Sequence, residues 1–146
     1  MKAVVQRVKR AAVHTGGACV GRTGPGMLVY LGVLRGDGPA QAEALAQRIA
    51  RFRFFTDARG RMNLAAAEAG AGALVVSQFT LAADGRKGRR PSFDRAAPPA
   101  EARGLYEHFV EVLSATGIPT ETGRFGAMME VECIVDGPVT FVLEET

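Results

Sequence analysis

Cysteine and histidine are scarce in this sequence, with two of each among 146 residues. Cys19 and Cys133 lie far apart and outside any Cys-x-x-Cys spacing, so the sequence predicts neither a zinc site nor a disulfide framework. His14 and His108 belong to no motif with metal-ligand spacing, which argues against a metal hydrolase. We therefore expect reduced thiols, no bound metal and no cofactor.

Long hydrophobic runs are absent as well. No stretch approaches the roughly 20 apolar residues that cross a membrane as a helix. Residues 1–10 mix apolar and charged side chains and lack the apolar centre of a signal peptide. We expect a cytoplasmic protein that makes no contact with a membrane.

The motifs of conventional hydrolases are missing too. There is no Gly-x-Ser-x-Gly elbow, and His108 falls on a predicted helix beside its apolar stripe, so a Ser-His-Asp triad is not supported. The acidic residues are dispersed and form no clear pair of catalytic carboxylates. A catalytic site in this chain would have to use other groups.

The composition is typical of one globular domain, with 47% hydrophobic and 23% charged residues and no repeat or linker. Apolar runs predict strands over residues 1–13, 27–33, 74–81, 125–136 and 139–143. Gly16-Gly17 predicts a two-residue hairpin turn. Because strands outnumber helices, we predict an α+β fold: a single compact domain over residues 1–146 with a largely antiparallel, barrel-like sheet and two main helices.

The two helices are predicted from their first turns and their apolar stripes. One begins at Pro39 and the other at Pro99, since proline suits the first turn of a helix. Gly117 is the expected stop of the second helix. The apolar stripes of the two helices are formed by Leu45, Ile49 and Phe52, and by Leu105, Phe109, Val112 and Leu113.

The predicted strand 74–81 carries three polar side chains in an apolar run: Ser77, Gln78 and Thr80. With backbone N–H groups, their hydroxyl and amide groups can hold a water or stabilise an oxyanion. In an alternating strand, however, Ser77 and Phe79 face one way and Gln78 and Thr80 the other, so that one polar pair simply meets solvent. The pattern alone favours this second interpretation.

A basic loop over residues 84–95 follows directly. It contains five cations and two acids and so accounts for the whole formal charge of +3. Clustered cations predict phosphate binding, although a solvated charged loop is an equally good interpretation of the composition. The cations are Arg86, Lys87, Arg89, Arg90 and Arg95.

Gly137-Pro138, between the last two predicted strands, is interpreted by default as a trans turn. Only about 5–6% of X-Pro bonds in folded proteins are cis. A cis bond would aim two successive carbonyl groups in an unusual direction.

Five motifs together resemble the D-aminoacyl-tRNA deacylase family, also called D-tyrosyl-tRNA deacylases. The resemblance is collinear from residue 1 to residue 143, so it is far more specific than any single motif. The motifs are Ala3-Val4-Val5-Gln6-Arg7-Val8, Ser77-Gln78-Phe79-Thr80-Leu81, Gly88-Arg89-Arg90-Pro91-Ser92-Phe93, Glu121-Thr122-Gly123-Arg124-Phe125-Gly126 and Gly137-Pro138-Val139-Thr140.

The resemblance implies an enzyme that hydrolyses the ester bond of D-aminoacyl-tRNA and releases free D-amino acid and tRNA. It implies a homodimer whose active site lies at the interface, with residues 77–80 of one chain facing Gly137-Pro138 of the other. This dipeptide is then cis, and its carbonyls accept the substrate's ammonium group while the backbone excludes an L side chain. Glycine has no side chain, so glycyl-tRNA should also be hydrolysed.

The resemblance further implies that the ribose 2′-hydroxyl of the terminal adenosine assists water attack. Thr80 is then the hydroxyl nearest the ester, supported by Ser77, Gln78 and the backbone of Phe79. Met128 stands where the family often has a polar residue. The implied substrate-binding residues are Gly137, Pro138, Val139, Thr140, Met129 beside the adenosine and Arg7 beside the dipeptide, and the implied tRNA-binding residues are Arg86, Lys87, Arg89 and Arg90.

Two alternatives stay open. In the first, Thr80 or Ser77 acts as a nucleophile, which lacks support because no adjacent base is visible. In the second, the chain is a non-catalytic tRNA-binding module that uses the basic loop alone. Phosphate binding alone gives no reason for the polar residues of 77–80 or for Gly137-Pro138.

Overall fold

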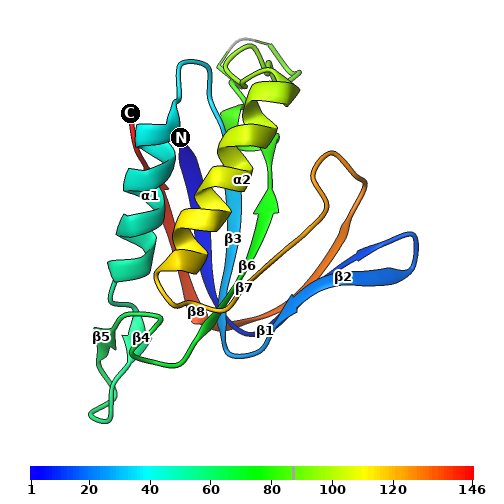
Figure 1. Ribbon diagram of the computed structural model, residues 1–146. Helices are drawn as coiled ribbons and strands as arrows, with labels where there is room; N and C mark the ends of the chain where they lie inside the picture. The colour runs from blue at the N-terminus through cyan, green and yellow to red at the C-terminus, as the bar shows by residue number, and fades with distance from the viewer. Residues whose placement is uncertain (87) are drawn as a thin grey trace.

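The computed structural model describes residues 1–86 and 88–146 and confirms the predicted α+β class. A six-stranded sheet is covered on one face by two long helices, and a two-stranded ribbon lies at one end (Figure 1). The elements are β1 (Lys2–Thr15), β2 (Ala18–Thr23), β3 (Gly26–Gly32), α1 (Pro39–Arg51), β4 (Phe55–Thr56), β5 (Met62–Leu64), β6 (Gly72–Ser77), the 3-10 helix η1 (Phe79–Ala82), α2 (Pro99–Ala115), β7 (Thr120–Thr122) and β8 (Glu130–Glu144).

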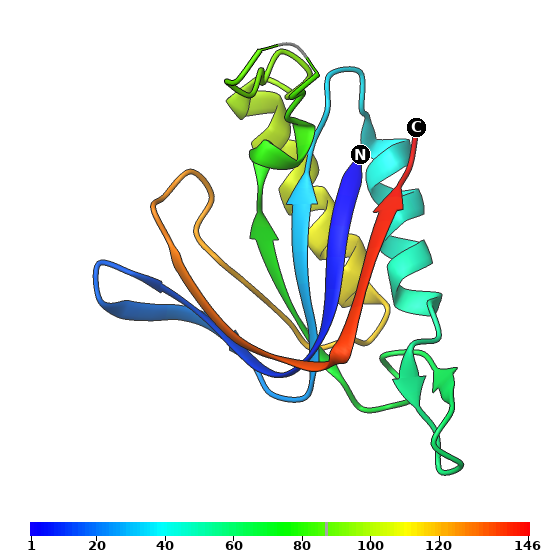
Figure 2. The same cartoon turned by 180° about the vertical axis from the view of Figure 1, so that it is seen from behind.

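The strand β1 is the centre of the sheet. It pairs antiparallel with β3 along its first half, with β2 along its second half, and with β8 along most of its length (Figure 2). Gly16 and Gly17 form the predicted hairpin turn with φ of 55° and 81°, values that cost glycine little.

The other half of the sheet is parallel. Strand β6 pairs parallel with both β3 and β7, while the four remaining pairings of the described residues are antiparallel. The sheet curls until β2 lies beside β7, where the backbone N–H of Arg22 donates to the Glu121 carboxylate at 2.7 Å. The result is a nearly closed, barrel-like core.

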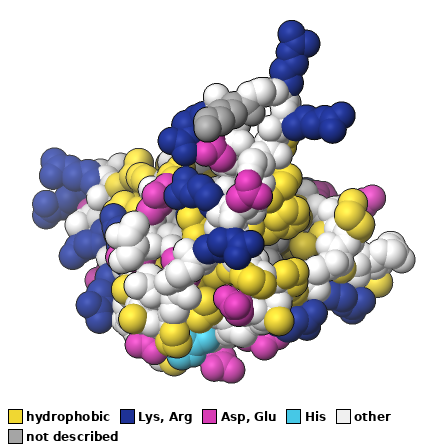
Figure 3. Space-filling model, turned by 90° about the horizontal axis from the view of Figure 1, so that it is seen from above, with side chains coloured by type: hydrophobic (Ala, Val, Ile, Leu, Met, Phe, Trp, Pro, Cys, Tyr) yellow, Lys and Arg dark blue, Asp and Glu magenta, His cyan; other side chains and the backbone are white. Residues whose placement is uncertain are grey.

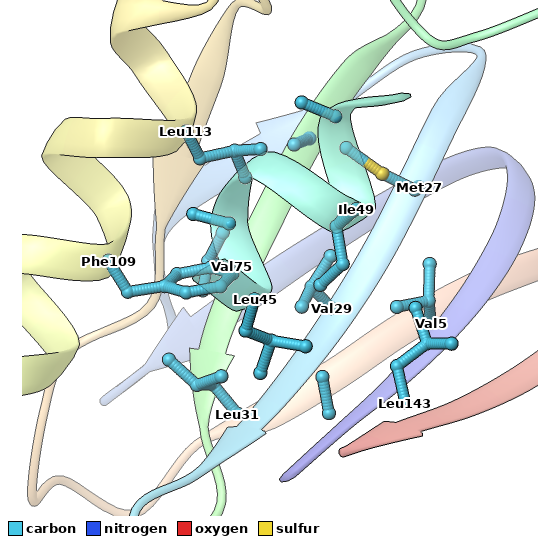
Figure 4. Packing of buried hydrophobic residues seen from close by; sticks show 14 of the residues in the cluster. Val5, Met27, Val29, Leu31, Leu45, Ile49, Val75, Phe109, Leu113 and Leu143 are labelled. Carbon is cyan, nitrogen blue, oxygen red and sulfur yellow. The ribbon is translucent and has the colours of Figure 1, made fainter. Parts of the chain in front are cut away.

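The two helices bury their apolar stripes against the same face of the sheet (Figure 4). Leu45 and Ile49 of α1 are fully buried, and Phe52 is half-buried just beyond the last turn. Burial of one such side chain stabilises the fold by about 1.5–3 kcal/mol. In α2 the buried residues are Ala102, Tyr106, Phe109 and Leu113, while the predicted Leu105 and Val112 are half-buried.

Two predicted strand boundaries are wrong. The strand predicted over 74–81 ends at Ser77, after which the chain turns into η1. The segments 125–136 and 139–143 are not two strands, because residues 125–129 form a turn and β8 runs unbroken from Glu130 to Glu144 with a bulge near its middle. Among the described residues, no helix is long and apolar enough to span a membrane.

Candidate active site

The 77–80 segment leaves the sheet at the carboxyl end of β6. The N–H of Gln78 donates to the carbonyl of Leu31 at 2.8 Å, and the N–H of Leu81 then donates to the carbonyl of Gln78 at 3.2 Å. The turn packs closely on Gly32, where a Cβ would lie 2.9 Å from the Cβ of Leu81 and 3.1 Å from the carbonyl oxygen of Gln78. Only glycine at position 32 leaves room for this turn.

The side chains of the segment point partly into solvent. Thr80 is exposed, and its Oγ1 accepts a hydrogen bond from the amide Nε2 of Gln78. Because the hydroxyl oxygen is an acceptor in that bond, its proton is free to donate to a substrate. Ser77 and Gln78 are half-buried, whereas Phe79 is 55% exposed. The alternating strand on which the solvent interpretation rested is therefore absent.

Neither histidine lies beside the Thr80 hydroxyl. Nε2 of His108 lies 2.9 Å from the Glu43 carboxylate, between α2 and α1. His14 lies on β1, opposite Cys19 on one side and Glu130 on the other. The described residues contain no group of His, Cys, Asp or Glu arranged to hold a metal.

The 137–138 segment forms the bulge of β8. The pairing of β1 with β8 passes from Gln6 opposite Thr140 to Val8 opposite Val135, so the bulge lies opposite Arg7. The Gly137–Pro138 peptide bond is cis, and both residues are exposed. Beside them, Val139 is buried and Thr140 Oγ1 accepts a hydrogen bond from Gln6 Nε2 at 3.3 Å.

Arg7 connects this bulge to the neighbouring ribbon. Its Nη1 donates to the carbonyl of Phe54 at 2.8 Å and to Oγ1 of Thr56 at 3.3 Å. Its Nε lies 3.1 Å from the carboxylate of Asp136, an ion pair whose N–H direction does not make an aligned hydrogen bond. The side chain is only 12% exposed, so these contacts fix the residue that precedes Gly137.

The two segments lie near opposite ends of β3. On β3, Met27 is opposite Arg7 and Leu31 is opposite Ser77. Four residues of strand separate these positions, about 13 Å at the usual rise of a strand. One chain therefore does not bring the 77–80 and 137–138 segments together.

Met129 lies elsewhere, in a smaller apolar cluster on the face of the sheet away from the helices. It packs over Gly123, where a Cβ would lie 2.8 Å from the Met129 sulfur. The preceding loop carries Phe125, whose ring has the Arg103 guanidinium above it, 5.0 Å from the ring centre. Arg103, Phe125 and Tyr106 line a cavity of about 400 Å³ beside β7.

Sequence reasoning did not identify Arg103 or Tyr106 in this region. Tyr106 donates its hydroxyl to the carbonyl of Val75 at 2.8 Å, two residues before the 77–80 segment. Burial raises the pKa of Tyr106 to about 12. No local pattern could have signalled either role, because both residues are brought to β6 and β7 only by the packing of α2.

The basic loop folds back on itself through a bridge between Asp84 and Ser92. Arg86 donates hydrogen bonds to the Asp84 carboxylate, the shortest at 2.6 Å, and holds the pKa of Asp84 well below its usual range. Arg89 and Arg90 are exposed, and Lys and Arg side chains project from this end of the molecule in Figure 3. Lys87 lies outside the described residues.

Comparisons with known proteins identify the family of the chain. Residues 4–144 match the family described as D-Tyr-tRNA(Tyr) deacylase. The chain belongs to this family. A D-aminoacyl-tRNA deacylase of Ruegeria pomeroyi is 55% identical over 99% of both chains, and one of Symbiobacterium thermophilum is 54% identical over 99% of this chain and 95% of that protein.

Two solved structures share the fold of this deacylase family member. A structure described as a c-Myc DNA unwinding element binding protein matches with a TM-score of 0.95 and 40% identity, covering 100% of this chain and 99% of that one. A probable eukaryotic D-amino acid tRNA deacylase matches with a TM-score of 0.81 and 20% identity, over 99% and 98% of the two chains. Family membership makes the chain an enzyme of the D-aminoacyl-tRNA deacylase type, a hydrolase of translation quality control.

Proposed function

We propose that this protein hydrolyses the ester bond between a D-amino acid and the 3′ end of tRNA in the cytoplasm, as a homodimer. The observation that carries the proposal is the pairing of an exposed hydroxyl at Thr80 with backbone N–H groups at the start of η1, and within residues 1–86 and 88–146 no histidine is hydrogen-bonded to that hydroxyl. Such a site suits electrostatic and orienting catalysis.

The backbone supplies the oxyanion site. The N–H groups of Phe79 and Thr80 begin η1, where no carbonyl of the turn precedes them as an acceptor. They stabilise the negative oxygen that forms when water attacks the ester carbonyl. Preorganised donors of this kind are worth about 2.7–4 kcal/mol of barrier each in other enzymes.

The tRNA supplies the activation of water. The 2′-hydroxyl of the terminal ribose orients the attacking water, a new carbon–oxygen bond forms, and the bond to the ribose 3′-oxygen breaks. One proton of the water passes to that 3′-oxygen, and the products are a D-amino acid and intact tRNA. The Thr80 hydroxyl, held through Gln78, positions the ester without becoming acylated.

The 137–138 segment of the partner subunit provides the chiral selection. The carbonyls of Gly137 and Pro138 accept the substrate's α-ammonium group, and the backbone around them leaves no space for an L side chain. Val139 and Thr140 border this wall, Arg7 positions it through Asp136, and Met129 lines the adenosine site. Glycine presents no side chain to the wall, so glycyl-tRNA is also a substrate.

The separation of the two segments within one chain supports the proposed homodimer. An isologous pair places the same two surfaces on both subunits, so residues 77–80 of each chain can face residues 137–138 of its partner. Two complete sites then form from two incomplete chains. The basic loop, including Arg86, Lys87, Arg89 and Arg90, holds the tRNA backbone beside each site.

The direct test is release of D-tyrosine from D-Tyr-tRNA by the pure protein, with L-Tyr-tRNA and glycyl-tRNA assayed beside it. We expect rapid release from the D and glycyl substrates and none from the L substrate. Salt-sensitive tRNA binding without any release would instead identify a non-catalytic binding module. Equal release from the D and L substrates would contradict chiral selection by the 137–138 segment.

A substrate that ends in 2′-deoxyadenosine separates the two hydrolytic routes. Assistance by the ribose predicts that this substrate is bound but not hydrolysed. Undiminished hydrolysis together with an acyl group on Thr80 or Ser77, seen by mass spectrometry after rapid quenching, would favour the side-chain nucleophile.

A further inference from the structure

Phe79 and Phe93 are the two exposed aromatic residues in the part of the chain that the structure describes. Phe79 is 55% exposed and Phe93 is 37% exposed. Their ring centroids lie 5.1 Å apart at an interplanar angle of 63°, an edge-to-face contact. In this geometry the edge of one ring meets the face of the other, so the contact between the rings covers at most one ring face.

The pair connects the 77–80 segment to the basic loop. Phe79 precedes Thr80 directly, and Phe93 follows Ser92, which bridges back to Asp84. Exposed arginines lie on both sides of Phe93 in the sequence, with Arg90 before it and Arg95 after it. The carbonyl of Asp94, the next residue, accepts a hydrogen bond from Nε of Arg35 at 2.6 Å, which anchors this side of the loop.

Open aromatic faces beside clustered cations are the combination by which proteins hold single-stranded nucleic acid. The cations bind the phosphates of the backbone, and the aromatic rings stack on successive bases with little preference for their sequence. A pair of rings that served the fold alone would be expected to bury its faces, as Phe54 and Phe109 do in the core. Phe93 lies in the basic loop, outside the segment that faces the partner subunit, and its exposure therefore points to a ligand.

We infer that the Phe79–Phe93 pair is a stacking platform for the unpaired nucleotides that precede the terminal adenosine of tRNA. This inference rests on the proposed function, because it takes the ester at Thr80 as the fixed point from which the RNA extends towards the basic loop. The occupant is single-stranded RNA because the neighbouring charge is positive and the path leads from the 77–80 segment into residues 84–95.

The test compares Phe93→Leu, which keeps apolar bulk but removes the ring, with Phe93→Tyr, which keeps the ring. Each variant is assayed on D-Tyr-tRNA and on the D-tyrosyl ester of adenosine alone. We expect Phe93→Leu to raise KM for D-Tyr-tRNA roughly tenfold, as loss of one stacked base predicts, with Phe93→Tyr close to the wild-type value. The adenosine ester lacks the stacked nucleotides, so its kcat/KM should be the same in both variants.

A second measurement needs no turnover. Uncharged tRNA with 2-aminopurine in place of the nucleotide before the terminal adenosine should change fluorescence on binding to the wild type and to Phe93→Tyr, but not to Phe93→Leu. An unchanged KM and an unchanged fluorescence response in Phe93→Leu would overturn the platform. An equal loss of kcat on both substrates would also overturn it, because Phe93 would then only position η1.

Failure of the proposed function gives a different result from failure of the platform. If the wild type hydrolysed neither ester, the deacylase proposal would fail, while the 2-aminopurine signal would still report whether the rings contact RNA. If the wild type hydrolysed both esters and no variant differed, the platform alone would fail.

Discussion

The segments near the two ends of β3 are held in place in different ways. The 77–80 segment is held by backbone hydrogen bonds to Leu31 and within its own turn, and by the absence of a side chain at Gly32. The 137–138 segment is an unpaired bulge between paired parts of β8, and the Arg7 side chain reaches from β1 to Asp136 and to the ribbon beside it. The first end should therefore be sensitive to backbone displacement, and the second to loss of a single guanidinium group.

The largest effect is expected from Gly32→Ala. The new Cβ would lie 2.9 Å from the Leu81 Cβ, so the turn has to move by several tenths of an ångström or more. Since a displacement of about 1 Å can cost roughly 100-fold in rate, we expect kcat on D-Tyr-tRNA to fall by about that factor. The control is Gly104→Ala on α2, where a Cβ meets nothing within 4 Å. A wild-type kcat in Gly32→Ala would show that the turn tolerates displacement.

Arg7→Lys tests the other end. An ammonium group cannot reproduce the contacts of the guanidinium with Phe54, Thr56 and Asp136, so we expect a loss of about 2 kcal/mol in the free energy of unfolding. The preference for D-Tyr-tRNA over L-Tyr-tRNA should fall as the bulge loosens. Urea denaturation and the two values of kcat/KM measure these effects.

The control for Arg7→Lys is Arg48→Lys, whose partner Glu145 lies on the surface. Exposed ion pairs contribute about 0–1 kcal/mol, so this variant should keep both stability and selectivity. If Arg7→Lys lowered stability but left the D-to-L ratio unchanged, Arg7 would support the fold without positioning the 137–138 segment.

The basic loop should give a smaller effect that reports on binding alone. Arg89→Gln removes one exposed cation, so KM for tRNA should rise several-fold with kcat unchanged, and the slope of log affinity against log salt should fall by about 1. Arg59→Gln, in the exposed turn of the ribbon, is the matched control and should change neither value. The same loss of affinity in both variants would mean that RNA responds only to total charge.

Tyr106→Phe should have the smallest effect, and mainly at high pH. Tyrosine ionises near pH 10 in the unfolded chain, while burial raises the pKa of Tyr106 to about 12 in the folded protein. The neutral Tyr106 hydroxyl therefore makes its full contribution to the free energy of unfolding below about pH 10, and this contribution is lost as the pH rises towards 12. Near pH 7 the free energy of unfolding of the variant should be about 1 kcal/mol lower than that of the wild type, because the hydrogen bond to Val75 is missing. Above pH 10 the free energy of unfolding of the variant should depend less on pH.

Tyr30→Phe is the control for that measurement, because burial also raises the pKa of Tyr30, the other tyrosine of the chain. Above pH 10, Tyr30→Phe should reduce the pH dependence of the free energy of unfolding less than Tyr106→Phe does. If the free energy of unfolding changed with pH above 10 in the same way in the wild type and in Tyr106→Phe, the Tyr106 hydroxyl would not be buried beside Val75.

Local chemistry predicted much of the fold. The glycine pair at positions 16 and 17, the prolines that open both helices and the stop at Gly117 each impose a backbone geometry that depends on few neighbours. The parallel pairing of β6 could not be predicted in this way. Strands buried on both faces have almost continuous apolar sequences, so their pattern carries no direction.

The sequence pointed to the 77–80 segment as a candidate site but did not predict its shape. The polar side chains of residues 77–80 made this segment a candidate site. The strand ends at Ser77, however, because the N–H of Gln78 makes the last hydrogen bond to β3 and the missing side chain of Gly32 leaves room for the turn. Nothing near position 78 in the sequence encodes that space. Likewise, the bulge at 136–139 depends on Arg7, which lies about 130 residues away in the chain and is brought close only by sheet pairing.

Subunit mixing tests the proposed division of the site between two chains most directly. Gly32→Ala damages one end, and Gly137→Ala damages the other, since its Cβ would lie 2.8 Å from the backbone nitrogen of Val139. Each variant alone should be nearly inactive on D-Tyr-tRNA. Co-refolded at equal amounts, half of the dimers are mixed and each mixed dimer has one intact site, so the mixture should regain about one quarter of the wild-type activity. A mixture no more active than its components would contradict a site shared between subunits.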